Sequence, residues 1–169
     1  MQTECNADLF GFARVEGRSV VGTFDGGKIT SDAGGLLLGA ADRAVGLIDR
    51  FARCFHDSRS EELIEHTVAT MVGQRIFGIA LGYEDVVDHD ELRHDPVMAI
   101  LAGKLIARRK NCAPEAGKST LNRLELGTDA PTAYRKISHD PQTIEALLVG
   151  LFLARRTGVY FPETARFAG

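Results

Sequence analysis

Histidine followed by aspartate is the pattern in this sequence that most invites a chemical role. Four of the five histidines precede an aspartate, and two of these steps stand close together in the stretch DHDELRHDP, residues 88–96. Neutral imidazoles and carboxylates together can hold a divalent metal ion that activates water. The residues that could supply such a ligand set are His66, His89, Asp90 and a later aspartate.

Helix geometry offers a simpler interpretation of the same steps. His89 and His94 are five residues apart, which turns them about 140° from each other on a helix, so they cannot share a metal ion as residues four apart can. In residues 94–96 and 139–141, both His-Asp-Pro, the aspartate fits as the N-cap of a helix whose first residue is the proline. The stretch therefore predicts two helix starts in tandem. An HD-type metal-dependent phosphohydrolase remains as the alternative.

The stretch AGKST, residues 116–120, ends like the loop that binds phosphate in nucleotide-dependent enzymes. That loop needs a glycine five residues before its Gly-Lys pair, where this sequence has Cys112. It also needs a preceding buried strand, whereas the residues before it predict a helix with a basic end. A nucleotide site is therefore not expected. A lysine followed by a helix that Ser119 or Thr120 caps can still hold a DNA phosphate, and the alternative is a plain surface loop.

The charge of the chain is unevenly distributed. Residues 1–99 hold 9 Lys and Arg against 17 Asp and Glu, whereas residues 100–169 hold 11 against 6, within a net charge of −3. Such a split indicates that the second half meets a polyanion. The side chains expected to contact DNA all lie in that half and are Arg108, Arg109, Lys110, Lys118, Ser119, Thr120 and Arg123.

Apolar spacing predicts the elements that position these residues. We expect a mainly α fold of about six helices, with a small N-terminal β-hairpin over residues 18–30. The first expected helix is capped by Ser31 or Asp32 and continues to Val45. The other expected helices span residues 47–55, 60–81, 96–110, 121–126 and 141–157. The apolar face of the last one includes Leu148 and is expected to pack in the core, with Gly158 as the C′ residue. Residues 1–17 are expected to be a disordered tail and 159–169 an irregular one, on either side of a helical region, 18–158.

Composition and cysteine usage limit the class of protein. Apolar residues make up 44% and charged residues 25% of the 169 residues, the balance of a soluble globular domain. No apolar run approaches the roughly 18–20 residues that cross a bilayer, and the N-terminus lacks the pattern of a secretory signal. Cys5, Cys54 and Cys112 are far apart and odd in number, which indicates reduced thiols in the cytoplasm.

Three segments of the chain carry a resemblance to a known family. They are FDGGKITSDAGGLLL (24–38), IEHTVATMVGQRIFGIALGYEDVVDHDELRHDPV (64–97) and AGKSTLNRLEL (116–126). In this order they resemble the N-terminal part of bacterial insertion-sequence transposases of the DDE type. The branch is the one in which a Gly-Tyr-Glu-Asp stretch follows a long helix and precedes an AGKSTLNRLE-like segment. The resemblance covers residues 20–155.

The resemblance implies DNA transposition by three carboxylates and two divalent ions, Mg²⁺ or Mn²⁺, on an RNase H-like core. In the family the first of these aspartates follows a helix like 141–157, on an apolar-Asp-x-Asp strand. Here no aspartate follows Asp140. No catalytic position can therefore be assigned, and no metal ion is expected in this chain.

The resemblance and the lack of that aspartate together predict a truncated N-terminal portion of a transposase. Such a chain would bind DNA or position element ends without catalysis, as a homodimer or paired with intact transposase. A stand-alone regulatory DNA-binding module is the first alternative, and the HD-type phosphohydrolase is the second.

Overall fold

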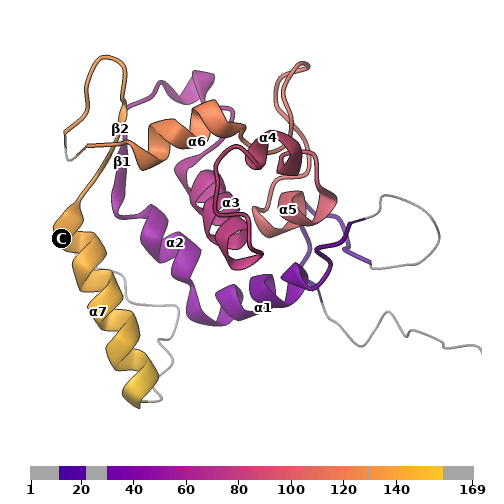
Figure 1. The fold of residues 1–169 in the computed structure, drawn as a ribbon, viewed down its shortest axis with the longest axis horizontal. Helices are drawn as coiled ribbons and strands as arrows, with labels where there is room; N and C mark the ends of the chain where they lie inside the picture. The colour runs from indigo at the N-terminus through magenta and orange to yellow at the C-terminus, as the bar shows by residue number, and fades with distance from the viewer. Residues whose placement is uncertain (1–11, 22–29, 129, 158–169) are drawn as a thin grey trace, which may run out of the picture.

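The fold is arranged around one helix, α3 (Val68–Ala80), which most of the other helices surround (Figure 1). A computed structural model describes residues 12–21, 30–128 and 130–157 of the chain. The mainly α prediction is confirmed, because these residues form seven α-helices and one short 3₁₀ helix. The other helices are α1 (Gly35–Val45), α2 (Leu47–Ala52), η2 (Glu61–Leu63), α4 (His89–Leu92), α5 (Pro96–Leu101), α6 (Lys118–Glu125) and α7 (Pro141–Thr157).

A two-stranded antiparallel sheet joins β1 (Phe55–Asp57) to β2 (Ile137–His139), with Phe55 opposite His139. This sheet is not the expected N-terminal hairpin, most of which falls on residues 22–29, outside the described residues. The helix expected to continue to Phe55 ends at Ala52 instead. Pairing with a segment far away in the sequence turns Phe55 into a strand residue, and local spacing carries no sign of such a partner.

Two apolar clusters fill the interior, and α3 contributes to both. The larger cluster holds Met71 of α3 against Leu121 of α6, and the smaller holds Phe77 of α3 against Met98 of α5. Met71, Met98 and Leu121 are each 0% exposed. The packing of α5 and α6 against α3 therefore fixes the centre of the molecule.

The helix α3 begins at Val68 and not at the expected Ser60. Thr67 Oγ1 accepts a hydrogen bond of 3.1 Å from the Thr70 amide and so caps the helix. Before this cap, Ile64 has an extended backbone, with φ −76° and ψ 111°. The expected start was wrong because an extended turn and a strong N-cap interrupt residues that are apolar at helical spacing. At the other end of α3, Ile79 is 51% exposed.

The helix α5 ends at Leu101, well before the basic residues with which it was expected to end. Gly103 has a φ of +75°, its amide donates to the Ile100 carbonyl over 3.1 Å, and the Lys104 amide donates to the Ala99 carbonyl over 2.9 Å. These two bonds make a Schellman C-cap, which needs the left-handed glycine. Residues 108–110 therefore lie on an irregular segment, and the prediction that they end a helix was wrong.

The two predicted His-Asp-Pro helix starts are confirmed. Asp95 Oδ1 accepts hydrogen bonds from the amides of Val97 (2.7 Å) and Met98 (3.1 Å) at the start of α5. Asp140 Oδ1 accepts one from the Gln142 amide (2.9 Å) at the start of α7. The helix α6 differs from its prediction, because it begins at Lys118 after Gly117 and not after a Ser119 or Thr120 cap.

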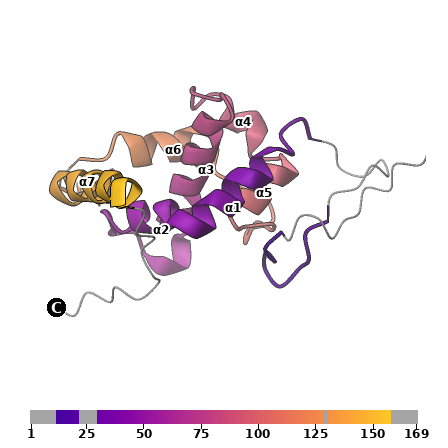
Figure 2. The same ribbon diagram turned by 90° about the horizontal axis from the view of Figure 1, so that it is seen from below.

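The helix α7 has the predicted bounds but not the predicted packing. It lies beside α2 at one end of the molecule, away from α5 (Figure 2). Leu147 is buried, whereas Leu148 is 56% exposed, so the expectation that Leu148 packs in the core was wrong. Gly158 and the expected tail 159–169 lie outside the described residues. None of the described helices has both the length and the apolar character needed to span a membrane.

Replacing Met98 by alanine tests the position of the core. The substitution is expected to lower the free energy of unfolding by about 2–5 kcal/mol, because it leaves a cavity at a fully buried site. Leu148→Ala is the matched control and is expected to change that free energy by about 0.5 kcal/mol or less, because the side chain is largely in solvent. Urea unfolding measures both. Equal losses in the two variants would contradict the exposed position of α7.

Candidate nucleic-acid interface

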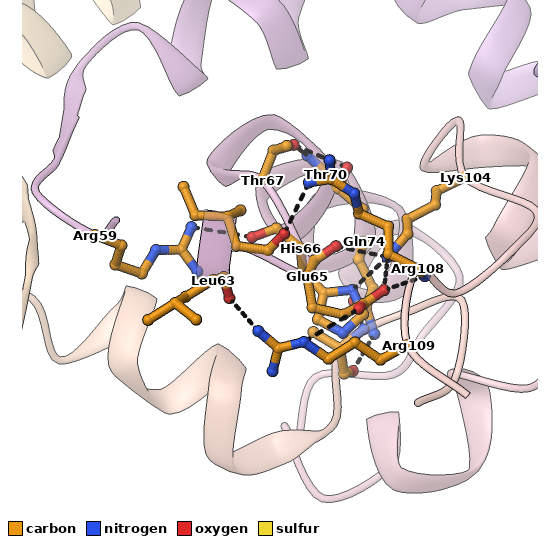
Figure 3. Close-up of polar contacts among 12 residues, drawn as sticks. Arg59, Leu63, Glu65, His66, Thr67, Thr70, Gln74, Lys104, Arg108 and Arg109 are labelled. Carbon is orange, nitrogen blue, oxygen red and sulfur yellow. Dashed lines mark hydrogen bonds and ion pairs between the residues drawn. The ribbon is translucent and has the colours of Figure 1, made fainter. Parts of the chain in front are cut away.

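The segment between α5 and α6 is held against the chain before α3 by one carboxylate, that of Glu65 (Figure 3). Lys104 Nζ donates to Glu65 Oε1 over 2.7 Å and to the Glu65 carbonyl over 2.6 Å. The Arg108 amide donates to the same Oε1 over 2.7 Å. Burial raises the pKa of Glu65, but the hydrogen bonds from Lys104 and from the Arg108 amide lower it more, so the net shift is downward. Glu65 is therefore an ionised anchor for the basic segment.

Two of the predicted DNA-binding side chains take part in the same anchoring. Arg108 Nη1 donates to the Ile64 carbonyl over 3.1 Å, and Arg109 Nη2 donates to the Leu63 carbonyl over 2.9 Å (Figure 3). Arg109 Nε also lies 4.0 Å from Glu65 Oε2, a distant ionic contact without a hydrogen bond. An arginine has five N–H donors, so both guanidinium groups keep donors for other ligands. Their first role is nevertheless to hold the end of η2.

The hollow beside Arg108 does not suit a phosphate. Its lining residues are Ser60, Glu61, Glu62 and Arg108. Two carboxylates beside a single guanidinium repel a further anion. The predicted contact at Arg108 thus borders acidic residues of η2.

The histidines considered for a metal site lie in separate polar contacts. His66 Nδ1 is 3.3 Å from Lys104 Nζ, and burial with the nearby Lys104 charge lowers the pKa of His66 from 6.5 to about 4. His89 is 0% exposed, and burial with the Arg75 charge lowers its pKa from 6.5 to about 4. Across the described ranges, no three His, Cys, Asp or Glu side chains come together in a way that could hold a metal ion.

A buried glutamine connects His89 to the start of α6. Gln74 Nε2 donates to the Ala116 carbonyl over 2.7 Å, and its Oε1 accepts from the Ala116 amide over 2.9 Å. The same Nε2 is 3.0 Å from His89 Nδ1, and Arg75 Nη1 is 3.0 Å from His89 Nε2. A neutral imidazole accepts at only one nitrogen, so only one of these two donors bonds to the ring. His89 therefore packs as a neutral side chain in a structural network.

The N-terminus of α6, where the AGKST stretch was expected to receive a phosphate, already faces a carboxylate. Asp90 Oδ1 accepts from the Lys118 amide over 3.0 Å, and Lys118 Nζ lies 3.8 Å from Asp90 Oδ2. A Cβ on Gly117 would lie 2.8 Å from Asp90 Oδ1, so the close approach requires glycine. A helix N-terminus favours an anion, and here that anion belongs to the chain itself. The side chains of Lys118 and Ser119 remain exposed.

Thr120 and Arg123, also predicted to contact DNA, line a different hollow of about 240 Å³ together with Lys136. It lies where the chain before α3, the helix α6 and the turn before β2 meet, and its lining contains no carboxylate. We call it the α6 groove, and its lining residues are Arg59, Ser60, Leu63, Thr120, Arg123, Tyr134, Lys136 and Ile137.

The DNA contacts expected from the sequence leave out three charged or aromatic members of the α6 groove, namely Arg59, Tyr134 and Lys136. The signal that could have found two of them is the aromatic-basic run Tyr134-Arg135-Lys136. Arg59 gave no such signal. Its guanidinium pairs with Asp57 over 2.7 Å and donates to the His66 carbonyl over 3.0 Å. The groove thus brings together three cationic side chains from three distant segments.

Glu115 is a buried carboxyl whose two oxygens accept no hydrogen bond from the residues that the structure describes. It is 1% exposed, and burial raises its pKa from 4.5 to about 8, with a smaller opposing effect of the Lys104 charge. A carboxyl with this pKa is protonated at neutral pH. Glu115 therefore lies neutral in the interior, directly before the Ala116 that Gln74 binds.

The buried groups predict how stability changes with pH. Between about pH 4 and 6.5 the unfolded chain binds protons at His66 and His89 that the folded chain does not, so the free energy of unfolding rises with pH. Between about pH 4.5 and 8 the folded chain keeps a proton on Glu115 that the unfolded chain loses, so this group makes the free energy fall as pH rises. We expect maximal stability near pH 6.5, measured by urea unfolding across this range.

Glu115→Gln is the control for the pH profile. The amide cannot ionise, so the decline in the free energy of unfolding above pH 6.5 should disappear, whatever the absolute stability of the variant. A wild-type profile that is flat between pH 6.5 and 8 would show that Glu115 is ionised in the folded chain.

The family of the chain follows from comparison with known proteins. Residues 12–158 match the family described as transposase DDE domain group 1, which is most of the sequence. No curated protein and no solved structure gives a significant match. The family acts on DNA and typically uses divalent ions, but the part of the chain that the structure describes offers no ligand group that fits them. The resemblance seen in the sequence is thereby confirmed at the level of the family, and this chain belongs to the DDE-type transposases.

Proposed function

We propose that this chain binds the DNA ends of a transposable element and positions them, while the described residues supply no catalytic carboxylates. The observation that carries the proposal is the α6 groove, which gathers three cations and the hydroxyl groups of Ser60 and Thr120 without a carboxylate in its lining. Phosphate oxygens are held by Arg and Lys together with hydroxyl groups, and such contacts set the register of a protein on DNA.

Two cations of the groove are available to a phosphate. Arg123 and Lys136 make no ion pair with any described residue, and both side chains are exposed. Arg59 is partly neutralised by Asp57. Each cation that neutralises a phosphate releases condensed counterions, so binding gains free energy at low salt. Arg123 and Lys136 are therefore the main contributors to affinity in this proposal.

The basic segment at Arg108, Arg109 and Lys110 has a supporting role in this proposal. Because Arg108 and Arg109 donate to the carbonyls of Ile64 and Leu63, they hold the chain that forms one side of the groove. Phosphate contacts at their remaining donors would add to the affinity.

Removing the two available cations tests the proposal. Arg123→Ala with Lys136→Ala should weaken binding to a duplex that carries the terminal repeat and to a random duplex alike. The slope of log affinity against log salt should become shallower by about 0.9 for each lost phosphate contact, so by up to about 2. Fluorescence anisotropy over a series of salt concentrations measures both quantities. An unchanged affinity and slope would exclude the groove as the DNA site.

Two further variants are compared with the Arg123→Ala, Lys136→Ala pair. Arg18→Ala with Arg43→Ala removes the same charge from exposed sites, and α1, which carries Arg43, lies on the other side of α3 from α6 (Figure 1). We expect little change in the salt slope. Replacing Arg108, Arg109 and Lys110 together by alanine should lower the urea midpoint and change the slope less than the groove pair does. A slope shallower by about 2–3 with unchanged stability would instead make these three the phosphate contacts.

The purified chain is also expected to bind DNA without cutting it. The described residues form no carboxylate cluster that could clamp two ions. A nicking assay on supercoiled and terminal-repeat DNA with Mg²⁺ or Mn²⁺ checks this. Cleavage that co-purifies with the chain through successive columns would show that its carboxylates do assemble a nuclease site.

A further inference from the structure

Tyr134 is the feature of the α6 groove that phosphate binding does not explain. Its side chain is 93% exposed, although it lines the groove beside cationic residues. Every exposed leucine, isoleucine and valine among the described residues has a lower exposed fraction, and the highest of these is 68%, at Leu63. An aromatic ring exposed to this extent loses the free energy that its burial would give. The ring is thus open to a ligand on a charged surface.

Hydrogen bonds fix the backbone around Tyr134. The Thr132 amide donates to the Arg135 carbonyl over 2.7 Å, and the Arg135 amide donates to Thr132 Oγ1 over 3.0 Å, which closes a tight turn with Tyr134 inside it. The Ser58 amide donates to the Lys136 carbonyl over 2.8 Å, and β2 follows immediately. This turn stands at the edge of the molecule beside α6 (Figure 1). A side chain on such an anchored turn starts from a fixed backbone position, which lowers the entropy cost of stacking.

The size and lining of the groove fit one nucleotide better than a double helix. The groove is a small hollow of about 240 Å³, so a double helix can contact its rim but cannot enter it. Leu63 and Ile137 give it an apolar part, and Arg123 and Lys136 give it charge. Proteins that hold single strands combine these features, because bases stack on aromatic rings while the backbone follows cationic side chains.

We propose that the α6 groove takes an unpaired nucleotide of the DNA, with its base stacked on Tyr134 and its flanking phosphates on Arg123 and Lys136. This inference depends on the proposed DNA-binding function and adds the kind of DNA that the groove selects. Because a base can reach the ring only when it is unpaired, the groove prefers DNA with a frayed or single-stranded end. A protein partner on the same ring is the competing possibility, and the charge of the groove favours the phosphodiester.

The experiment compares a blunt random duplex with the same duplex carrying an unpaired oligothymidylate tail. The wild-type chain should bind the tailed probe more tightly. Tyr134→Ala should weaken binding to the tailed probe by about 5-fold or more, the loss of one stacked base, and leave the blunt duplex unaffected. Tyr134→Phe should keep the preference, because the phenyl ring stacks as well. The salt slope should stay the same in both variants, since neither removes a charge.

A fluorescent base gives a direct readout of stacking. With 2-aminopurine placed in the tail, binding of the wild-type chain should quench its fluorescence, and Tyr134→Ala should abolish the quenching. Urea unfolding should show equal stability of both variants, because the side chain at position 134 is in solvent.

The other possible outcomes distinguish the DNA-binding proposal from the nucleotide-site proposal. If Tyr134→Ala keeps full affinity for the tailed probe while Arg123→Ala with Lys136→Ala loses it, the DNA-binding proposal stands and the nucleotide site is overturned. If neither variant changes binding, both are overturned. If Tyr134→Ala alters only self-association in sedimentation, the ring is a protein contact and the nucleotide site is again overturned.

Discussion

The side-chain amide of Gln74 is the contact on which the arrangement of the chain depends. It lies on α3 with no exposure and bonds both the amide and the carbonyl of Ala116. One such bond contributes about 0.5–1.5 kcal/mol net, but a buried backbone group left without a partner costs about 1–3 kcal/mol. Because residues 102–117 contain neither helix nor strand, side-chain contacts such as this one and that of Asp90 with the Lys118 amide fix where α6 begins. Gln74 supplies the hydrogen bonds that a neighbouring backbone would otherwise make with Ala116, and it thereby places α6 against α3.

Ionic contacts also fix the segment between α5 and α6. The Lys104–Glu65 pair lies in a largely buried setting, where an ion pair stabilises only if further hydrogen bonds satisfy its atoms. The Arg108 amide and the Glu65 carbonyl supply those bonds. Glu115 receives none, and it avoids the cost of a buried charge by keeping its proton. One segment thus contains both a compensated ion pair and a neutral carboxyl, which makes its attachment sensitive to pH.

These contacts matter to the family function because they build the α6 groove from distant parts of the chain. Arg59, Arg123 and Lys136 come from the chain before α3, from α6 and from the turn before β2. A transposase must hold its DNA in a fixed geometry, and side chains on anchored segments do this more accurately than side chains on loose ones. The polar contacts that stabilise the fold therefore also set the distances between the cations offered to DNA.

The sequence alone determined the features that depend on neighbours in the chain. The Asp95 and Asp140 caps, the bounds of α7 and the break at Gly46 follow from local geometry, and the ordered AGKSTLNRLEL-like segments identified the family. Local signals also placed Thr120 and Arg123 among the expected DNA contacts. They did not indicate which of those contacts lie side by side in the fold.

Tertiary structure decided the remainder. It paired Phe55 with His139, gave the α6 N-terminus to Asp90, and brought Arg59, Tyr134 and Lys136 to one groove. The physical reason is that each of these outcomes is a contact between segments far apart in sequence. Such contacts become favourable only after both segments are ordered, so the spacing within either one contains no trace of the other.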